Sequence, residues 1–151
     1  MLRWYDDNLN CLADSWRAGS GTNTDTCDVG DGWLPNGWYD LWGMYDHKDG
    51  TAIDGRAWYL QDKQCHDGTW RTELFIHTEE TVDNGQSCPT SGDDPHCWEG
   101  TFDYKSNGCI KIAYPNSGFP NDIGDAHGDW HRNVSGSHGT FTSTDRLYVH
   151  S

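Results

Sequence analysis

The core of this chain must be built largely from aromatic side chains. Its 151 residues include nine Trp, seven Tyr and four Phe, whereas Leu, Val and Ile are few. Each ring buries a large apolar area, so a real core can form although only 34% of the residues are hydrophobic. Glycines separate short runs of β-forming residues, and no run has the apolar period of a long amphipathic helix. These features predict a single all-β domain over residues 1–151.

The net charge of the chain excludes two classes of partner. Ten Lys and Arg stand against 24 Asp and Glu, which gives a formal charge of −14. Nucleic acids and anionic membrane surfaces are bound through clustered basic residues, so we expect neither nucleic-acid binding nor membrane insertion. No apolar run reaches the length of a membrane-spanning helix. The first residues, Met1 to Tyr5, do not have the charged-then-apolar pattern of a secretory leader.

Cysteine usage indicates an oxidising compartment, because the chain carries cysteines at positions 11, 27, 65, 88, 97 and 109. Cys11 with Cys27, and Cys88 with Cys97, bracket polar loops that a disulfide would stabilise. The pairing itself stays open from sequence alone. If Cys109 remains reduced, one more cysteine is left over, and Cys65 is the first choice. We therefore expect a secreted, periplasmic or cell-wall protein.

Strand-forming runs and turn residues predict the order of the elements. We expect strands at residues 38–45, 57–60, 70–77, 109–114 and 146–149, a first strand around 8–12 and a short helix within 122–130. Residues 79–105 form a long acidic insertion that contains two cysteines. A loop of this length in a compact domain indicates a lid or binding loop, and a disulfide-stapled surface excursion is the alternative.

Cys109 and His77 can form a nucleophile and its base. A free thiol has a pKa of about 8.5, so it needs a neighbouring imidazole to ionise near neutral pH. Gly108 would let a substrate carbonyl approach the backbone, and the N–H groups around Gly108 and Cys109 could hold a developing oxyanion. The alternative is structural: Asn107-Gly108 is a hairpin turn signal, and the residues after it alternate like a strand.

Three separated segments resemble the catalytic domain of the L,D-transpeptidases. Leu34-Pro35-Asn36-Gly37-Trp38-Tyr39 resembles the family's Thr-Pro-x-Gly-x-Tyr/Phe signature, and Phe75-Ile76-His77-Thr78 is similar to its Ile-His-Gly/Ser segment. Ser106-Asn107-Gly108-Cys109-Ile110-Lys111-Ile112 is similar to the Ser/Thr-His-Gly-Cys-hydrophobic-Arg/Asn-hydrophobic motif. The resemblance covers roughly residues 8–149. It implies a β-sandwich-like fold with one short helix, and cross-linking of bacterial peptidoglycan stem peptides by a monomer without a cofactor or metal.

The resemblance also implies roles for individual residues. Cys109 would attack a tetrapeptide donor and expel its terminal D-Ala, with His77 as the general base, before an amine or water resolves the thioester. Gly108 and Cys109 amides would bind the oxyanion, and Ser106 would brace the loop. Asn107 replaces the motif histidine and cannot carry a proton at neutral pH. Candidate substrate-binding residues are Lys111, Thr78, Arg71 and Trp98, with a surface ion pair to Glu73 as the alternative role of Arg71.

Other functions remain open from the sequence. The same thiol could serve an L,D-carboxypeptidase or a D-amino-acid exchange reaction, for example in an antibacterial effector. A Trp-rich, acidic, disulfide-bonded β-domain also has the composition of a non-catalytic secreted cell-wall or carbohydrate-binding module. Alternating Asp and His residues at 125–131 have metal-ligand character, but their glycine-containing setting favours a polar loop or helix.

Overall fold

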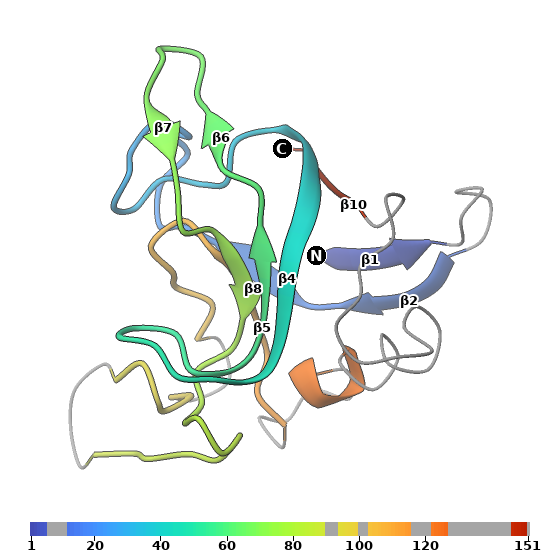
Figure 1. Cartoon of the computed structure of the whole chain (residues 1–151), viewed down its shortest axis with the longest axis vertical. Coiled ribbons are helices and arrows are strands. Elements are labelled where there is room, and N and C mark those ends of the chain that lie inside the picture. The colour runs from blue at the N-terminus through green and yellow to red at the C-terminus, as the bar shows by residue number, and fades with distance from the viewer. Residues whose placement is uncertain (6–11, 90–93, 100–102, 116–121, 127–145, 151) are drawn as a thin grey trace.

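The computed structural model describes residues 1–5, 12–89, 94–99, 103–115, 122–126 and 146–150 (Figure 1). The protein is all-β, as its sequence predicts. A six-stranded sheet has the order β10-β4-β5-β8-β9-β3, and two further sheets pair β1 with β2 and β6 with β7. The strands are β1 (Leu2–Tyr5), β2 (Leu12–Trp16), β3 (Ala18–Ser20), β4 (Gly37–Lys48), β5 (Gly55–Leu60), β6 (Lys63–Gln64), β7 (Trp70–Arg71), β8 (Phe75–His77), β9 (Ile110–Ile112) and β10 (Arg146–Val149).

The long strand β4 curves through the middle of the molecule (Figure 1). Its pairing with β5 shifts register between Leu41 and Gly43 and again between Tyr45 and Lys48, and such irregularities bend a strand and increase its twist. The chain enters β4 through the Pro35–Tyr39 segment. There the buried Tyr39 hydroxyl donates to the Pro35 carbonyl at 2.6 Å, which closes the turn.

The two faces of the six-stranded sheet carry different side chains. One face packs on the main core, whose buried members are Trp16, Leu34, Tyr39, Trp58, Leu60, Leu74, Ile76, Ile110, Ile112, Ile123 and Ala126. Successive residues of a strand point to opposite sides, so Phe75 and His77 lie on the face opposite Ile76. On that second face Ala57, Phe75 and Cys109 form a smaller buried cluster, against which Ile53 and Tyr59 pack.

The strand prediction was right for most elements and wrong for one long run. The runs 38–45, 57–60 and 146–149 lie in β4, β5 and β10, and residues 123–126 are helical within the predicted helix. The predicted strand 70–77 is two strands, because Glu73 has a φ of 55° and breaks the extended backbone between them. Most of the predicted first strand, and the part of the helix after residue 126, lie outside the described residues.

The structure corrects the disulfide expectation. Cys88 pairs with Cys97 as the sequence suggested, but Cys27 pairs with Cys65 rather than leaving Cys65 over. Among the described cysteines, Cys109 is free and buried, and Cys11 lies outside the described residues. The Cys27–Cys65 bond ties the loop before β4 to the β6–β7 hairpin, a contact between segments 38 residues apart that proximity in sequence does not indicate.

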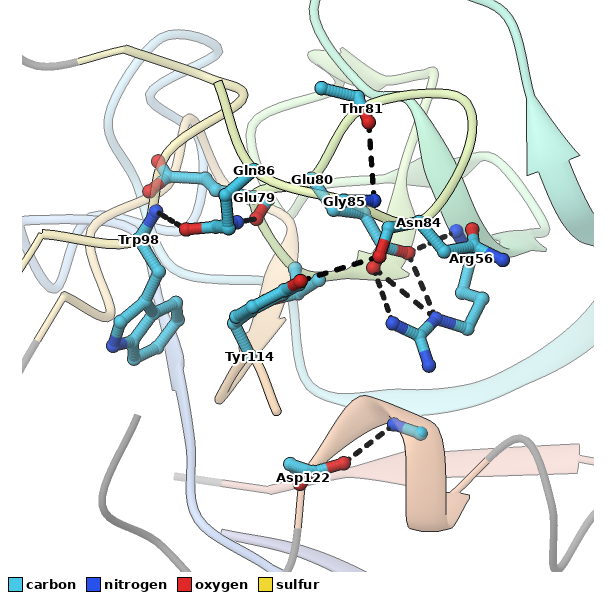
Figure 2. A network of polar contacts seen from close by, with 12 residues as sticks. Arg56, Glu79, Glu80, Thr81, Asn84, Gly85, Gln86, Trp98, Tyr114 and Asp122 are labelled. Carbon is cyan, nitrogen blue, oxygen red and sulfur yellow. Dashed lines mark hydrogen bonds and ion pairs between the residues drawn. The ribbon is translucent and has the colours of Figure 1, made fainter. Parts of the chain in front are cut away.

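The insertion that begins after β8 is anchored by polar contacts (Figure 2). The buried Glu80 carboxylate binds Arg56 of β5, with Nη2 to Oε2 at 2.6 Å. Gln86 donates to the Glu79 carbonyl at 2.6 Å and accepts from the Trp98 N–H at 2.8 Å. These bonds tie the start of the insertion to β5 and join two of its segments to each other. In the described ranges, no helix is long and apolar enough to span a membrane.

Candidate active site

Parallel pairing of β8 with β9 brings the two candidate catalytic residues to one face of the sheet. Ile76 pairs with Ile110 and His77 with Lys111. Cys109 directly precedes Ile110, so it lies on the same face as Phe75 and His77 and one step diagonal to His77. The residue that pairs directly with His77 is Lys111, and Cys109 lies two residues before it along the chain.

Cys109 lies in an apolar setting. It is 7% exposed, and its sulfur is 3.8 Å from the Glu73 carbonyl oxygen, to which the thiol donates. Burial raises the pKa of the Cys109 thiol to about 11, although the Phe75 N–H and the charge of Arg71 act in the opposite direction. The resting group is therefore a protonated thiol, which needs a base at the moment of reaction.

His77 is also buried, and its ring is oriented by the backbone. Nδ1 lies 2.8 Å from the Thr78 carbonyl oxygen. A carbonyl can only accept, so Nδ1 carries the proton and Nε2 is left as the basic nitrogen. Burial lowers the pKa of His77 to about 4, despite a smaller opposing effect of the Thr78 hydrogen bond. His77 is thus a neutral imidazole with its acceptor nitrogen available near neutral pH.

The thiol and the imidazole do not bond to each other directly. In the described part of the chain, the hydrogen bonds of Cys109 and His77 go to the separate carbonyls of Glu73 and Thr78. Any proton transfer between the sulfur and Nε2 would need a bridging substrate atom or water molecule.

Arg71 is a buried structural residue that packs against Gly108, which corrects its expected role as a substrate-binding residue. It is 1% exposed, so neither a surface ion pair with Glu73 nor a free substrate contact describes it. Its guanidinium donates to the carbonyls of Thr26, Trp33 and Gly32 at 2.6, 3.2 and 3.2 Å. The same group packs against Gly108, where a Cβ would collide with Nη2.

Two serines fix the backbone around the thiol. Ser106 accepts from the Gly21 N–H at 3.0 Å and donates to the Cys109 carbonyl at 2.6 Å. Ser20 donates to the Gly108 carbonyl at 3.4 Å and accepts from the Leu34 N–H at 3.1 Å. The nucleophile loop is therefore held by residues from the β3 end of the sheet. Asn107 is exposed at its tip.

The remaining predicted substrate contacts are buried. Lys111 is 1% exposed and pairs with Glu79 and with Asp103, the latter at 2.9 Å. Its ammonium also lies 5.4 Å from the ring centroid of Trp98, which is 8% exposed. Thr78, at 1% exposure, orients His77 through its backbone. These placements make the three residues parts of the support rather than open substrate contacts.

Lys111, Glu79 and Asp103 form a cluster, called the Lys111 cluster, in which one of the two acids carries a proton. Burial and the nearby Asp103 raise the pKa of Glu79 to about 9. Burial would raise the pKa of Asp103 as well, but hydrogen bonds with Glu79 and Lys111 keep it below the ordinary value. At neutral pH the charges of Lys111 and Asp103 therefore balance beside a neutral Glu79. This cluster joins the insertion to β9 two residues beyond Cys109.

Sequence reasoning missed the contribution of Glu73. Its left-handed φ of 55° is uncommon for a residue with a side chain. Its carbonyl oxygen accepts a hydrogen bond from the Cys109 thiol. Backbone strain of this kind often accompanies functional sites. The available signal was one acidic residue directly before the apolar residues Leu74, Phe75 and Ile76.

Two groups of potential metal ligands occur among the described residues. Cys27, Cys65 and His66 lie together, but the two sulfurs are joined in a disulfide. Glu79, Glu99 and Asp103 form the other group, and Lys111 already occupies it as the cation. Asp125 belongs to the described residues, whereas positions 127, 129 and 131 of the alternating Asp and His run lie outside them.

The pH dependence of thiol alkylation tests this description of Cys109. Since its pKa is raised to about 11, the thiolate fraction continues to grow above the pKa of free cysteine. We expect the rate of Cys109 alkylation by iodoacetamide to rise about tenfold per pH unit from about pH 7 to 10. Peptide mapping of the Cys109 fragment gives the rate. A plateau near or below pH 8.5 would contradict the buried protonated thiol.

Comparison with protein-family models, curated proteins and solved structures finds no match for this chain.

Proposed function

We propose that the protein is a cysteine acyltransferase that acts on peptidoglycan stem peptides. The observation that carries the proposal is the placement of a reduced cysteine and a neutral, backbone-oriented histidine on one face of adjacent parallel strands. A protonated thiol and a neutral imidazole on one sheet face are the two groups that general-base activation of a nucleophile requires. The resemblance of three segments to L,D-transpeptidases supports the choice of substrate.

The proposed reaction has two balanced steps. The thiol proton passes through a bridging water molecule or substrate atom to His77 Nε2 as the sulfur attacks the donor carbonyl carbon, and the S–C bond forms. The C–N bond to the terminal D-Ala then breaks, and the leaving nitrogen takes the proton from the imidazolium. In the second step a neutral acceptor amine, which has lost a proton to solvent, attacks the thioester carbon and gives a second proton to His77. The C–S bond then breaks, and the leaving sulfur takes that proton back to restore the thiol. Attack by water instead gives hydrolysis.

The charge of the chain suits an amine acceptor. A primary amine is protonated in solution, and a net charge of −14 attracts such a cation toward the protein. Phe75, which shares the cluster of Cys109, already carries an alkylammonium on its ring: Lys48 Nζ lies 5.3 Å from the ring centroid. Lys48 and Tyr59 already occupy this ring, so attraction of the acceptor rests on the overall charge of the chain.

Substrate access requires movement at the edge of the site. Ile53 and Tyr59 pack over the cluster that contains Cys109. The segment that carries Ile53 is held by Asp54, which accepts from the Gly50 N–H at 2.6 Å and pairs with His96 of the insertion at 2.8 Å. We propose that this segment and the insertion open together to admit the donor peptide.

Incubation with a purified disaccharide-tetrapeptide tests the proposal. We expect intact-mass spectrometry to show an acyl group on Cys109, with release of D-Ala, followed by dimers when the acceptor amine is present. Protein alkylated at Cys109 serves as the control and should give neither product. Tripeptide without dimers would identify the carboxypeptidase alternative, and D-Ala replacement by an added D-amino acid the exchange alternative. No acyl-enzyme and no D-Ala release would overturn the proposal.

A further inference from the structure

Exposed aromatic side chains gather on the sheet face that carries the thiol. Trp38 and Trp42 of β4 are 48% and 49% exposed, and Tyr148 of β10 is 54% exposed. Tyr39 and Leu41 pack on the core, so strand alternation places Trp38 and Trp42 on the opposite face. Most proteins hide rings of this size, and an exposed group of them marks a binding surface.

The rings on this face form two contacting groups, one of which includes Phe75 of the Cys109 cluster, and are together called the aromatic track (Trp38, Trp42, Tyr59, Phe75 and Tyr148). Trp38 contacts Tyr148 with ring centroids 4.9 Å apart. Trp42 meets Tyr59 edge-on at 5.6 Å, and Tyr59 stacks on Phe75 at 4.9 Å. Trp38 and Trp42 are four residues apart in one strand, a rise of about 13 Å. The aromatic track is therefore longer than a single six-membered ring of a bound molecule.

Polar groups lie between the exposed rings of the track. Asp40 and Arg146 are 3.1 Å apart, and their side chains are about half exposed. Their charges cancel, while their oxygens and nitrogens remain able to bond to a ligand. The aliphatic side chains of the same strands, Leu41, Met44, Leu147 and Val149, pack against the core instead. The face thus offers flat rings and hydrogen-bonding groups rather than an aliphatic groove.

This composition matches the chemistry of a sugar ring. A pyranose presents an apolar C–H face that can cover an aromatic ring, and hydroxyl groups around its edge that need polar partners. A polyanionic ligand is disfavoured by the net charge of −14. We propose that the aromatic track binds a linear chain of uncharged pyranose sugars, with Trp38, Trp42 and Tyr148 as stacking platforms and Asp40 and Arg146 as hydroxyl partners. This binding does not depend on the acyl-transfer reaction.

Isothermal titration with a hexamer of β-1,4-linked N-acetylglucosamine tests the proposal. The Cys109→Ala protein is used, so that no turnover complicates the heats. We expect saturable binding, and a loss of about tenfold in affinity for each of Trp38→Ala and Trp42→Ala. Trp70→Ala is the matched control, because Trp70 is 58% exposed on β7, in a different sheet. Its affinity should equal that of the parent protein.

Three results would overturn the assignment. The first is an absence of binding for this hexamer and for the corresponding glucose hexamer. The second is an equal loss of affinity in Trp42→Ala and Trp70→Ala. The third is a preference for a sulfated glycan over the neutral ones. Failure of the sugar titration leaves the acyl-transfer proposal standing, because that proposal is tested by the acyl-enzyme on Cys109.

Discussion

Cys109→Ala is expected to abolish release of D-Ala from the tetrapeptide donor, a loss on the order of 10⁴-fold or more. Alanine removes the sulfur that forms the thioester but keeps a small apolar side chain in the cluster with Ala57 and Phe75. Cys109→Ser keeps the shape of the side chain and should be almost as inactive, since a hydroxyl is much harder to ionise. Turnover is measured by chromatography of released D-Ala, and folding by circular dichroism.

His77→Gln should lower the rate by about 10²–10⁴-fold, the usual contribution of a general base. His47→Gln is the matched control: Nδ1 of His47 also lies 2.9 Å from a backbone carbonyl, that of Val82, but the ring is exposed at the end of β4. The control should keep full activity. Wild-type rates in His77→Gln would transfer the role of base to another group, and full activity in Cys109→Ala would end the acyl-transferase proposal.

Gly108→Ala is expected to destabilise the protein by about 3 kcal/mol or more. Gly108 has a φ of 91°, which a residue with a Cβ adopts only with strain. The added methyl would also collide with the buried guanidinium of Arg71, whose bonds to three carbonyls leave it little freedom to move. Urea denaturation measures the change in the free energy of unfolding.

Gly30→Ala provides the control for this substitution. Its Cβ would meet only the Asp28 carboxylate at 3.7 Å, an ordinary contact distance. We expect a change within about 0.5 kcal/mol. If both alanine variants unfold at the same urea concentration, the packing of Arg71 against Gly108 is not a determinant of stability.

Local patterns in the sequence were enough to predict the fold class and most strands. Alternation along Phe75, Ile76 and His77 also predicts which of these side chains share a sheet face, and a short polar loop predicts the Cys88–Cys97 bond. The parallel pairing of β8 with β9 has no such local signal. It joins segments separated by the whole insertion, and a hairpin was an equally good reading of Asn107-Gly108.

The contacts around Cys109 could not be predicted from the sequence for a similar reason. Arg71 reads as a free cation in the sequence, because its carbonyl acceptors belong to a loop about forty residues earlier. Lys111 reads as a substrate contact until the insertion supplies Glu79 and Asp103. Both positive charges are satisfied by segments that only the tertiary fold brings near. Sequence patterns suggest Cys109 and His77 as a candidate pair but do not predict the residues that support them.

The protein contains both a disulfide, Cys27–Cys65, and a free thiol, Cys109, in segments that contact each other through Arg71. The loop that binds Arg71, and through it the backbone at Gly108, is closed by the oxidised Cys27–Cys65 pair. Cys109, directly after Gly108, is a free thiol, and the proposed reaction needs it to stay reduced. Its 7% exposure and raised pKa make it a slow partner for oxidants and for stray disulfides. Burial thus protects the Cys109 thiol from oxidation, whereas a strong reducing agent would break the Cys27–Cys65 bond that closes the loop around Arg71.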